Sequence, residues 1–251
     1  MRPPQLVGTA MLRVEKVSVR RGAATTLQDV SLTLAAGRTL AVVGESGAGK
    51  STLINAILGL AQCAAGHVTW NDAPVTHCRP ALVMQEPRAA FNPRQTLRRS
   101  VMEPVVAQRA PTNPDGLRML CDGLEIELDL LDRRPSEVSI GQAQRMGILR
   151  ALIAAPPLML FDEPLSALDA VTQKHTARLI AQMQERIGFA ALIVTHDLGY
   201  AAAFADDIAV LRAGRIEEFG PAQAFVTAPQ TDYGRKLRDA AFALGALERV
   251  A

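Results

Sequence analysis

The sequence predicts an α/β protein in which a mainly parallel sheet is accompanied by a small antiparallel sheet and a helical insertion. A glycine-rich loop at 44–52 separates a short apolar run from a longer one, which indicates a strand, a loop and a helix in that order. Two later runs, 158–161 and 190–195, are apolar almost throughout, as the buried central strands of a parallel sheet are. A fourth segment, 30–35, alternates apolar with polar or small residues, which indicates a strand with one buried face.

The N-terminal third of the chain is expected to be rich in strands. Residues 1–10 predict a lead-in without regular structure, and the valine-rich segment 12–19, which alternates imperfectly, predicts an edge strand. Further strands are expected at 30–35, 38–43, 67–71 and 82–84. Two or three of these strands around the glycine-rich loop would form the antiparallel sheet beside the main one.

From Glu86 arginine and proline become frequent, and we interpret about 86–150 as a mostly helical insertion. Helices are expected at about 95–109, 113–131 and 141–155. The pair Pro156-Pro157 would end the last of them, because proline cannot continue a helix. A loose linker is the alternative, but four leucines have the spacing of one helix face. They are Leu117, Leu120, Leu124 and Leu128.

Strands and helices are expected to alternate in the C-terminal third. We expect a helix at 171–187 ended by Gly188, a strand at 190–195, a helix at 198–205, a strand at 208–211 and a closing segment at 214–217. Five apolar residues of the tail fall on one face of a last helix. They are Leu237, Ala241, Leu244, Leu247 and Val250. Packing on the core is the expected use of that face, and a groove of a partner protein is the alternative.

Composition restricts the possible classes of function. The chain has 251 residues, enough for one large α/β domain, and its 49% of hydrophobic residues is usual for a globular protein. The net charge of +2 gives no electrostatic case for binding nucleic acid. Cys63, Cys78 and Cys121 lack the spacing of a zinc site or a disulfide framework and are expected to be reduced thiols. No segment has the length and apolar character of a membrane span, so any membrane association is expected through partners.

The glycine-rich loop fits the phosphate-loop pattern G-x-x-x-x-G-K-[ST]. Its residues are Gly44, Glu45, Ser46, Gly47, Ala48, Gly49, Lys50, Ser51 and Thr52. The glycines allow a tight turn that points backbone N–H groups inward, where they and the helix N-terminus would bind a polyphosphate. Lys50 would reach the β- and γ-phosphates, and the Ser51 hydroxyl would bind Mg²⁺. A chance match is the alternative, and the flanking strand and helix argue against it.

Polar residues at the ends of three other expected strands complete a candidate catalytic site. Asp162 ends an apolar run and can hold Mg²⁺ opposite Ser51, and Glu163 beside it can accept a proton from an attacking water. His196 is placed for the γ-phosphate, and Gln85 could touch the metal ion and the water. The alternatives are solvated loop acids, a structural histidine and a surface amide. Their shared position at strand ends favours the catalytic interpretation.

These residues belong to six motifs in the order typical of the nucleotide-binding subunit of ABC transporters, and the chain resembles that family from end to end. The motifs are the phosphate loop at 44–52, the Q-loop at Gln85, the signature at 138–142, the Walker B segment at 158–163, the D-loop at 166–169 and the switch histidine His196. Gln144-Arg145 also matches the usual continuation of the signature.

The resemblance implies a fold and its divisions. It implies the α/β fold of the P-loop NTPases, as an ABC-type ATPase with a small antiparallel β subdomain and an inserted α-helical subdomain. One ABC ATPase domain would cover 1–251. Within it we expect a nucleotide-binding core with the antiparallel β subdomain at about 11–85 and 156–220, a helical subdomain with the signature at about 86–150, and a helical tail at about 221–251.

The resemblance also implies a mechanism and partners. Two such domains would dimerise head to tail around ATP and Mg²⁺, so that Ser139, Gly141 and Gln142 of the signature face the γ-phosphate of the opposite site. Asp169 would lie in the D-loop. Closure of the dimer on ATP and its reopening after hydrolysis would move the helices of two permease subunits. The permeases would dock near Gln85 and the helical insertion. A substrate-binding protein would deliver the solute to them. The second ABC ATPase could be the same chain or a different one, so a homodimer and a heterodimer are both open.

The implied place of work is the cytoplasmic face of the bacterial inner membrane, as a peripheral subunit that meets the membrane only through its partners. No nucleic acid is implied as a partner. The resemblance leaves the transported solute open, because the motor domain does not contact the cargo.

Two residues depart from the family pattern. Ile140 replaces the first glycine of the signature, and its β-branched side chain is expected to hold back the nucleotide or to disfavour the required φ. We therefore expect a heterodimer with unequal sites, and a subunit that binds nucleotide with little hydrolysis is the alternative. Arg21 falls where many members stack an aromatic ring on adenine, a contact that contributes about 1–3 kcal/mol. A guanidinium can also stack, so we expect modestly weaker ATP binding.

The resemblance extends to one group of importers. The segments 84–94 and 229–233 resemble the dipeptide, oligopeptide and nickel importer group, and the absence of a cysteine-bearing C-terminal extension favours its nickel or metallophore members. The alternative is an ABC-type ATPase of a soluble enzyme complex such as the carbon–phosphorus lyase. DNA-repair or translation ATPases usually carry two cassettes or zinc or coiled-coil insertions. A plain P-loop kinase would lack the signature and His196.

Overall fold

The structure is a computed structural model that describes residues 11–22, 24–244 and 246–247. Its central layer is a six-stranded sheet with the order β10-β9-β3-β8-β7-β6. The strands are β3 (Thr39–Val43), β6 (Ala81–Val83), β7 (Leu158–Asp162), β8 (Ala190–Thr195), β9 (Asp207–Arg212) and β10 (Arg215–Pro221). All neighbours pair in parallel except β10, which runs antiparallel to β9.

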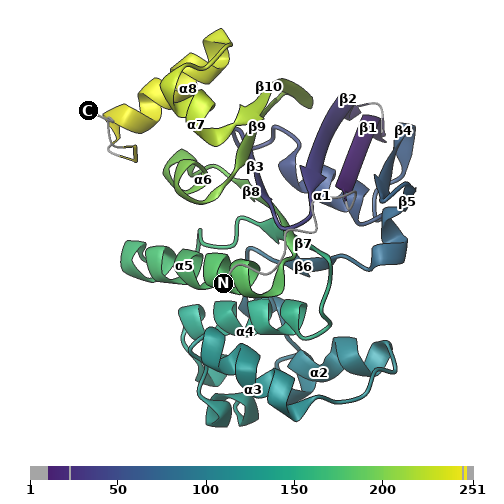
Figure 1. Ribbon diagram of the computed structural model, residues 1–251, viewed down its shortest axis with the longest axis vertical. Coiled ribbons are helices and arrows are strands. Elements are labelled where there is room, and N and C mark those ends of the chain that lie inside the picture. Colours follow the sequence, from purple (N-terminus) through teal and green to yellow (C-terminus); the bar gives the residue numbers. More distant parts are fainter. Residues whose placement is uncertain (1–10, 23, 245, 248–251) are drawn as a thin grey trace.

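The central strands are buried on both faces, as their sequences predict. Every residue of β3 and β8 is buried, and β7 is buried from Leu158 to Phe161. Helices cover both faces of the parallel part of the sheet (Figure 1), so a strand there needs apolar side chains in both directions. The predicted α/β fold is confirmed.

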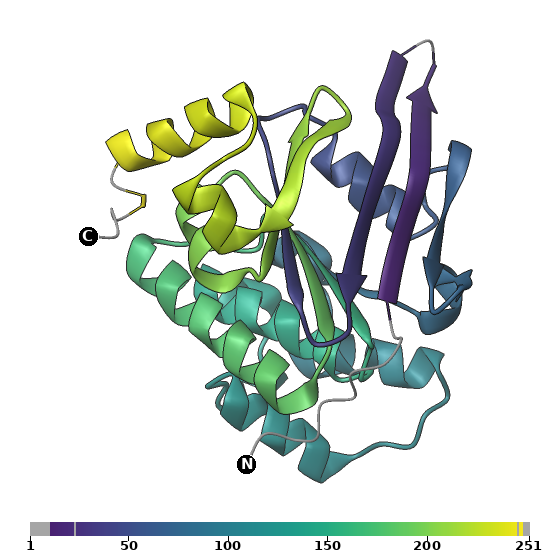
Figure 2. The same cartoon turned by 45° about the horizontal axis from the view of Figure 1, so that its top comes forward.

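The predicted antiparallel sheet is also present, with the order β2-β1-β4-β5. Its strands are β1 (Met11–Arg21), β2 (Ala24–Ala35), β4 (Cys63–Trp70) and β5 (Ala73–Pro74). The prediction of an edge strand at 12–19 is wrong, because β1 lies between β2 and β4 (Figure 2). Its imperfect alternation comes from bulges: the pairing shifts between Val14 and Val17, and Lys16 between them has a φ of 49°.

The α-helices group at the two ends of the molecule and along the main sheet (Figure 1). They are α1 (Lys50–Ile57), α2 (Leu97–Ala107), α3 (Pro114–Gly123), α4 (Ile140–Leu152), α5 (Ala170–Ile187), α6 (Leu198–Phe204), α7 (Ala222–Thr227) and α8 (Asp232–Ala243). Short 3₁₀ helices are η1 (Val75–Cys78), η2 (Arg88–Ala90), η3 (Leu128–Asp132) and η4 (Pro135–Glu137). No helix among the described residues is both long and apolar enough to cross a membrane.

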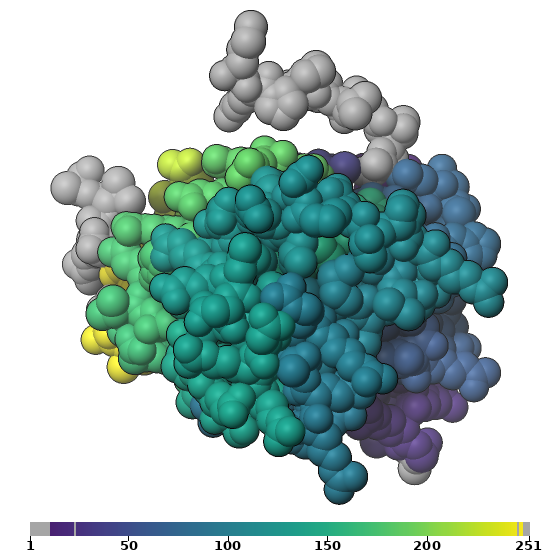
Figure 3. Space-filling model, turned by 90° about the horizontal axis from the view of Figure 1, so that it is seen from below, coloured from purple at the N-terminus to yellow at the C-terminus, as the bar shows by residue number. Residues whose placement is uncertain are grey.

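The segment between β6 and β7 is helical, but one predicted helix is too long. The helix α3 ends at Gly123 and does not continue to 131, because Glu125 takes a left-handed φ of 51°. Leu120 and Leu124 of the predicted leucine face are buried in one cluster, but Leu128 lies in η3 and is 38% exposed, so the prediction that it shares this face is wrong. Seen from below, the teal helical segment covers much of this face of the molecule (Figure 3).

The C-terminal helices pack on the opposite end of the sheet from this segment (Figure 1). Ala241 is buried there, and Leu237 and Leu247 pack partly against the same cluster. The prediction that Leu244 shares this packed face is wrong, since it is 85% exposed. Leu244 is the C-cap of α8 and keeps a right-handed helical backbone, so helical spacing alone did not decide which side chains of this face are covered. Val250, the last residue of the predicted face, lies outside the described residues.

Candidate functional site

Four loops meet at one edge of the main sheet. The strands β3, β8, β7 and β6 are neighbours in that order and run parallel, so their carboxyl ends lie together. Each end is followed by a predicted site residue: Gly44 after β3, His196 after β8, Asp162 and Glu163 at β7, and Gln85 after β6. The sheet topology therefore brings together residues that lie far apart in the sequence.

The loop between β3 and α1 is built on glycine backbone. Gly49 caps α1 with a φ of 109°, which glycine adopts without a steric penalty. Gly44 approaches β9, the neighbour of β3 in the sheet, so closely that a Cβ on Gly44 would lie 2.2 Å from the Leu211 carbonyl oxygen. The Lys50 side chain is 7% exposed, and its Nζ donates to the carbonyl oxygens of Gly44 and Glu45 at 2.9 and 3.1 Å. The lysine therefore lies inside the loop that its backbone forms.

The remaining residues of the loop divide into a tip and a base. Glu45, Ser46 and Gly47 form an exposed tip, and Gly47 has a left-handed φ of 81°. Ala48 and Thr52 are buried at the base. The tip is closed by a hydrogen bond from the Ala48 N–H to the Glu45 carbonyl oxygen at 3.2 Å. A turn of this kind leaves backbone N–H groups available to an anion.

The strand ends converge on the side chain of Glu163. Its carboxylate lies 3.7 Å from Lys50 Nζ, accepts a hydrogen bond from Gln85 Nε2 at 3.4 Å and lies 3.1 Å from His196 Nδ1. The backbone is held as well, because the Glu163 N–H donates to the Val194 carbonyl oxygen at 2.9 Å. Its φ of 45° is uncommon outside glycine, and such residues cluster at functional sites. One carboxylate thus joins residues that follow three different strands.

A second contact links the helix α1 to the end of β7. Ser51 Oγ donates to Asp162 Oδ1 at 3.3 Å. Burial raises the pKa of Asp162, and the hydrogen bond from Ser51 opposes that shift. A hydroxyl and a carboxylate side by side are hard oxygen donors of the kind that Mg²⁺ prefers, so these residues fit a magnesium ion next to the loop. Within the described part of the chain, no cluster of three His, Cys, Asp or Glu side chains offers another metal site.

The signature segment forms the N-terminus of α4. Ser139 is its N-cap: Ser139 Oγ accepts from the Gln142 N–H at 3.1 Å, and Gln142 Oε1 accepts from the Ser139 N–H at 2.8 Å. This reciprocal pair is a capping box. Among the described residues, no hydrogen bond or ion pair joins Ser139, Gly141 or Gln142 to Lys50 or Glu163. The structure does not bring the signature to the phosphate loop of its own chain.

Ile140 is the first residue of α4, with the negative φ of a helix, and its side chain is 44% exposed. The expectation that an isoleucine disfavours the required φ is therefore wrong, because a right-handed helical conformation suits any L-residue. The bulk of the exposed side chain is the remaining difference from glycine.

Asp169 begins the next helix, α5, close to the signature. Its Oδ1 accepts from the N–H groups of Val171 and Thr172 at 3.1 and 3.0 Å, and its Oδ2 accepts from the Thr172 hydroxyl at 2.7 Å. These bonds, with those from Thr172 strongest, lower the pKa of Asp169. The two helix starts touch, since a Cβ on Gly141 would lie 3.0 Å from Thr172 Cγ2. The D-loop and the signature therefore share one surface.

Arg21 ends β1 and is exposed near the tip of the hairpin with β2. No hydrogen bond or ion pair of its side chain to the phosphate loop exists among the described residues. Two contacts that sequence reasoning missed do reach the loop. A Cβ on Gly49 would lie 2.8 Å from the Thr26 carbonyl oxygen, and the Gly214 N–H donates to the Ala48 carbonyl oxygen at 2.9 Å. Both use backbone atoms, so no side-chain motif signals them.

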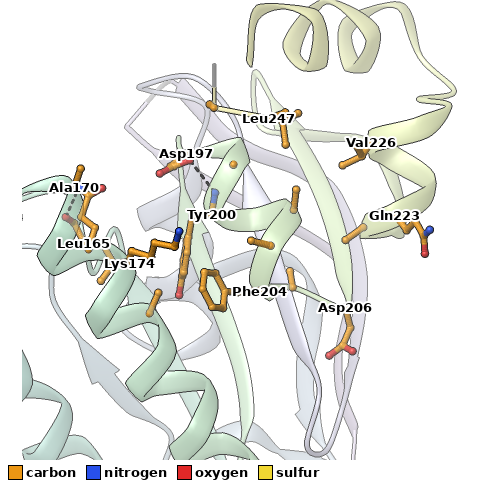
Figure 4. Close-up of a pocket in the computed structure, with 18 of the residues that line it drawn as sticks. Leu165, Ala170, Lys174, Asp197, Tyr200, Phe204, Asp206, Gln223, Val226 and Leu247 are labelled. Carbon is orange, nitrogen blue, oxygen red and sulfur yellow. Dashed lines mark hydrogen bonds between the residues drawn. The ribbon is translucent and has the colours of Figure 1, made fainter. Parts of the chain in front are cut away.

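A cavity of about 840 Å³ lies between α5, α6 and α7 (Figure 4). Lys174, Tyr200 and Phe204 line it, and Leu165 and Asp197 connect it to the segments that follow the strand ends. None of the predicted site residues lines this cavity. It is therefore a separate space from the phosphate loop.

Comparison with known proteins places the chain among ATP-binding subunits of transporters. The family model described as "ABC transporter" matches residues 27–166. The oligopeptide transport ATP-binding protein OppF of Escherichia coli (strain K12) is 35% identical over 84% of this chain and 67% of the relative. The nickel import ATP-binding protein NikE of the same strain is 35% identical over 85% of this chain and 84% of the relative.

Solved structures agree with this result. The ATP-binding cassette MJ0796, solved as a dimer in a post-hydrolysis state bound to ADP and phosphate, is 27% identical over 84% of this chain and 98% of that chain. Its TM-score with this structure is 0.71.

Proposed function

The chain belongs to the ABC transporter family of ATP-binding proteins, and we propose that it is the ATP-binding and ATP-hydrolysing subunit of an importer. The observation that carries this proposal is the position of the Glu163 carboxylate, which contacts Lys50, Gln85 and His196 beside the phosphate loop. The names of OppF and NikE support a small solute as the cargo of the complex, either nickel with or without a metallophore, or a peptide.

The proposed reaction is attack of water on the γ-phosphorus of ATP, which breaks the bond from that phosphorus to the β,γ-bridging oxygen and releases ADP and inorganic phosphate. The N–H groups of 44–52 and the Lys50 ammonium group bind the β- and γ-phosphates. Glu163 accepts the proton of the attacking water, Gln85 orients that water, and His196 binds the γ-phosphate. Ser51, Asp162 and Gln85 would hold Mg²⁺, which supplies positive charge next to the phosphates.

A second ABC ATPase is the proposed partner across the nucleotide. Ser139, Gly141 and Gln142, together with Asp169, would serve the ATP site of that partner, because the capped N-terminus of α4 is suited to an anion. The dimeric form of MJ0796 supports such a pairing. Ile140 adds an exposed apolar side chain to the same surface. We therefore propose a heterodimer in which the site completed by this signature is the weaker one.

The other proposed partners are two permease subunits and a substrate-binding protein. The permeases would dock near Gln85 and the helical subdomain at about 86–150, where Met84 is an exposed apolar residue. The core at about 11–85 and 156–220 and the tail at about 221–251 complete the proposed division of the domain. The subunit would work at the cytoplasmic face of the bacterial inner membrane, held there by its partners.

Co-purification tests this function. A tagged Glu163→Gln variant should bind ATP and accumulate in the closed dimer, because it lacks the proposed base. Native membranes are solubilised in ATP, and the proteins retained with the tag are identified. Two permeases and a second ATPase are the expected result. Retention of soluble phosphonate-degrading enzymes in place of permeases would overturn the importer and support the alternative of an enzyme complex.

A further inference from the structure

The C-terminal helix α8 contacts the end of β9 through one cation–π pair. The guanidinium carbon of Arg212, the last residue of β9, lies 4.4 Å from the centroid of the Tyr233 ring in the first turn of α8. The Tyr233 hydroxyl oxygen is shielded from solvent and has no hydrogen-bond partner among the described residues. A guanidinium at this distance from an aromatic face is attracted to it.

The same end of β9 supports the phosphate loop. The Leu211 carbonyl oxygen, next to Arg212, occupies the space into which a Cβ on Gly44 would point. Two residues after Arg212, Gly214 donates its N–H to the Ala48 carbonyl oxygen at 2.9 Å. The β9 end and the turn after it therefore hold the loop at both its first glycine and its base.

The tip of the loop also faces α8. Burial raises the pKa of Tyr233, and the neighbouring Glu45 carboxylate adds to that shift. Glu45 is the first tip residue after Gly44 and carries a negative charge on a loop whose predicted ligand is also negative.

The start of α8 is fixed to β10, so it can act as a support. Glu218 of β10 accepts hydrogen bonds from the N–H groups of Gln230 and Thr231 at 2.8 and 3.1 Å, and from the Thr231 hydroxyl at 2.9 Å. Gly234 lies against the same carboxylate, where a Cβ would come within 2.4 Å of Glu218 Oε2. The position of Tyr233 relative to β9 and β10 is thereby set.

We propose that Tyr233 and Arg212 are positioning residues of the nucleotide site, which act through the β9 end to hold the phosphate loop. The inference rests on the proposed binding of ATP by this chain. It assigns a part of the site to the C-terminal helix, which contains none of the six motifs. The ring stacked on Arg212 carries the effect, so loss of the ring weakens ATP binding while loss of the hydroxyl alone does not.

The affinity of the purified full-length chain for a fluorescent ATP analogue with Mg²⁺ tests this inference. Tyr233→Leu and Arg212→Met are each expected to raise the Kd about fivefold, in keeping with a partly desolvated cation–π pair. The Kd of the double variant should be no higher than that of the weaker-binding single variant, because each substitution removes the same contact. Tyr233→Phe should stay within about twofold of the original chain, since the ring remains. In the assembled complex, KM for ATP should rise with kcat unchanged.

The matched control is Leu237→Ala, which loosens the packing of α8 on the same hydrophobic cluster at a residue one helical turn further along. It should lower the melting temperature and leave the Kd unchanged. The inference is overturned if Tyr233→Leu folds and binds like the original chain, or if Leu237→Ala raises the Kd equally. An original chain that binds no ATP would instead overturn the proposed function.

Discussion

Glu163 Oε1 lies 3.7 Å from Lys50 Nζ, although the strands that precede them, β7 and β3, are separated in the sheet by β8. The lysine side chain is buried and also donates to two carbonyl oxygens of its own loop. The geometry of the phosphate loop and the position of the proposed base are therefore coupled through one ammonium group. A change that displaces either residue is expected to affect the other.

The close approach of Gly44 to β9 predicts a stability difference between two glycine substitutions. Gly44→Ala would drive a Cβ to 2.2 Å from a backbone oxygen and should lower the free energy of unfolding. Overpacking of this kind costs about 1–3 kcal/mol. Gly147→Ala is the matched control: it lies inside α4 with no atom near its Cβ position, and it should raise that free energy by about 0.5–1 kcal/mol. Urea unfolding measures both, and equal stability of Gly44→Ala and the original chain would contradict the described contact.

The N-cap Asp169 predicts a dependence of stability on pH. Its pKa is lowered in the folded chain, so it binds a proton more readily when unfolded, near the ordinary aspartate pKa of about 3.9. Its contribution is present above that pH and is lost as the pH falls through the lower folded pKa. Asp169→Asn keeps a capping oxygen without the charge, so the melting temperature should fall less steeply between neutral and acid pH. An unchanged acid slope would count against the charged cap.

The exposed Ile140 predicts an effect on turnover in the assembled heterodimer. Ile140→Gly removes the side chain that we propose weakens the site of the partner, so ATP turnover should increase as that site becomes active. Ile187→Gly, which removes an exposed isoleucine at the far end of α5, is the control and should leave turnover unchanged. Phosphate release from the purified complex measures both. If Ile140→Gly folds and turnover stays the same, the proposed inequality of the sites does not come from Ile140.

The sequence predicted the elements whose pattern is local. The buried strands β7 and β8 are apolar along their length, and Gly188 ends α5 with a φ of 87° as expected. The prediction of an edge strand at 12–19 was wrong because the position of a strand in a sheet depends on its pairing partners, which the periodicity of its sequence does not reveal. The over-long helix after 113 failed because Glu125 adopts a left-handed conformation that its residue type does not signal.

The residues of the candidate site were likewise predictable only where a local sequence pattern marks them. Gln85, Asp162, Glu163 and His196 were predictable, since each follows an apolar run and parallel strands place their ends together. Thr26 and Gly214 were not, because they touch the phosphate loop through backbone atoms. The pairing of Arg212 with Tyr233 depends on how α8 folds back on β9, which no local pattern encodes.

ATP turnover by the purified membrane complex that contains Glu163→Gln tests the central claim most directly, when ATP affinity is measured on the same sample. The substitution keeps the size of the side chain and its contact with Gln85 and removes the base. Turnover should fall by about 10²–10⁴-fold, as expected for loss of a general base, while ATP affinity stays close to that of the original complex. Turnover within about tenfold of the original, well short of the loss of a general base, would contradict the assignment of Glu163 as the base of the reaction.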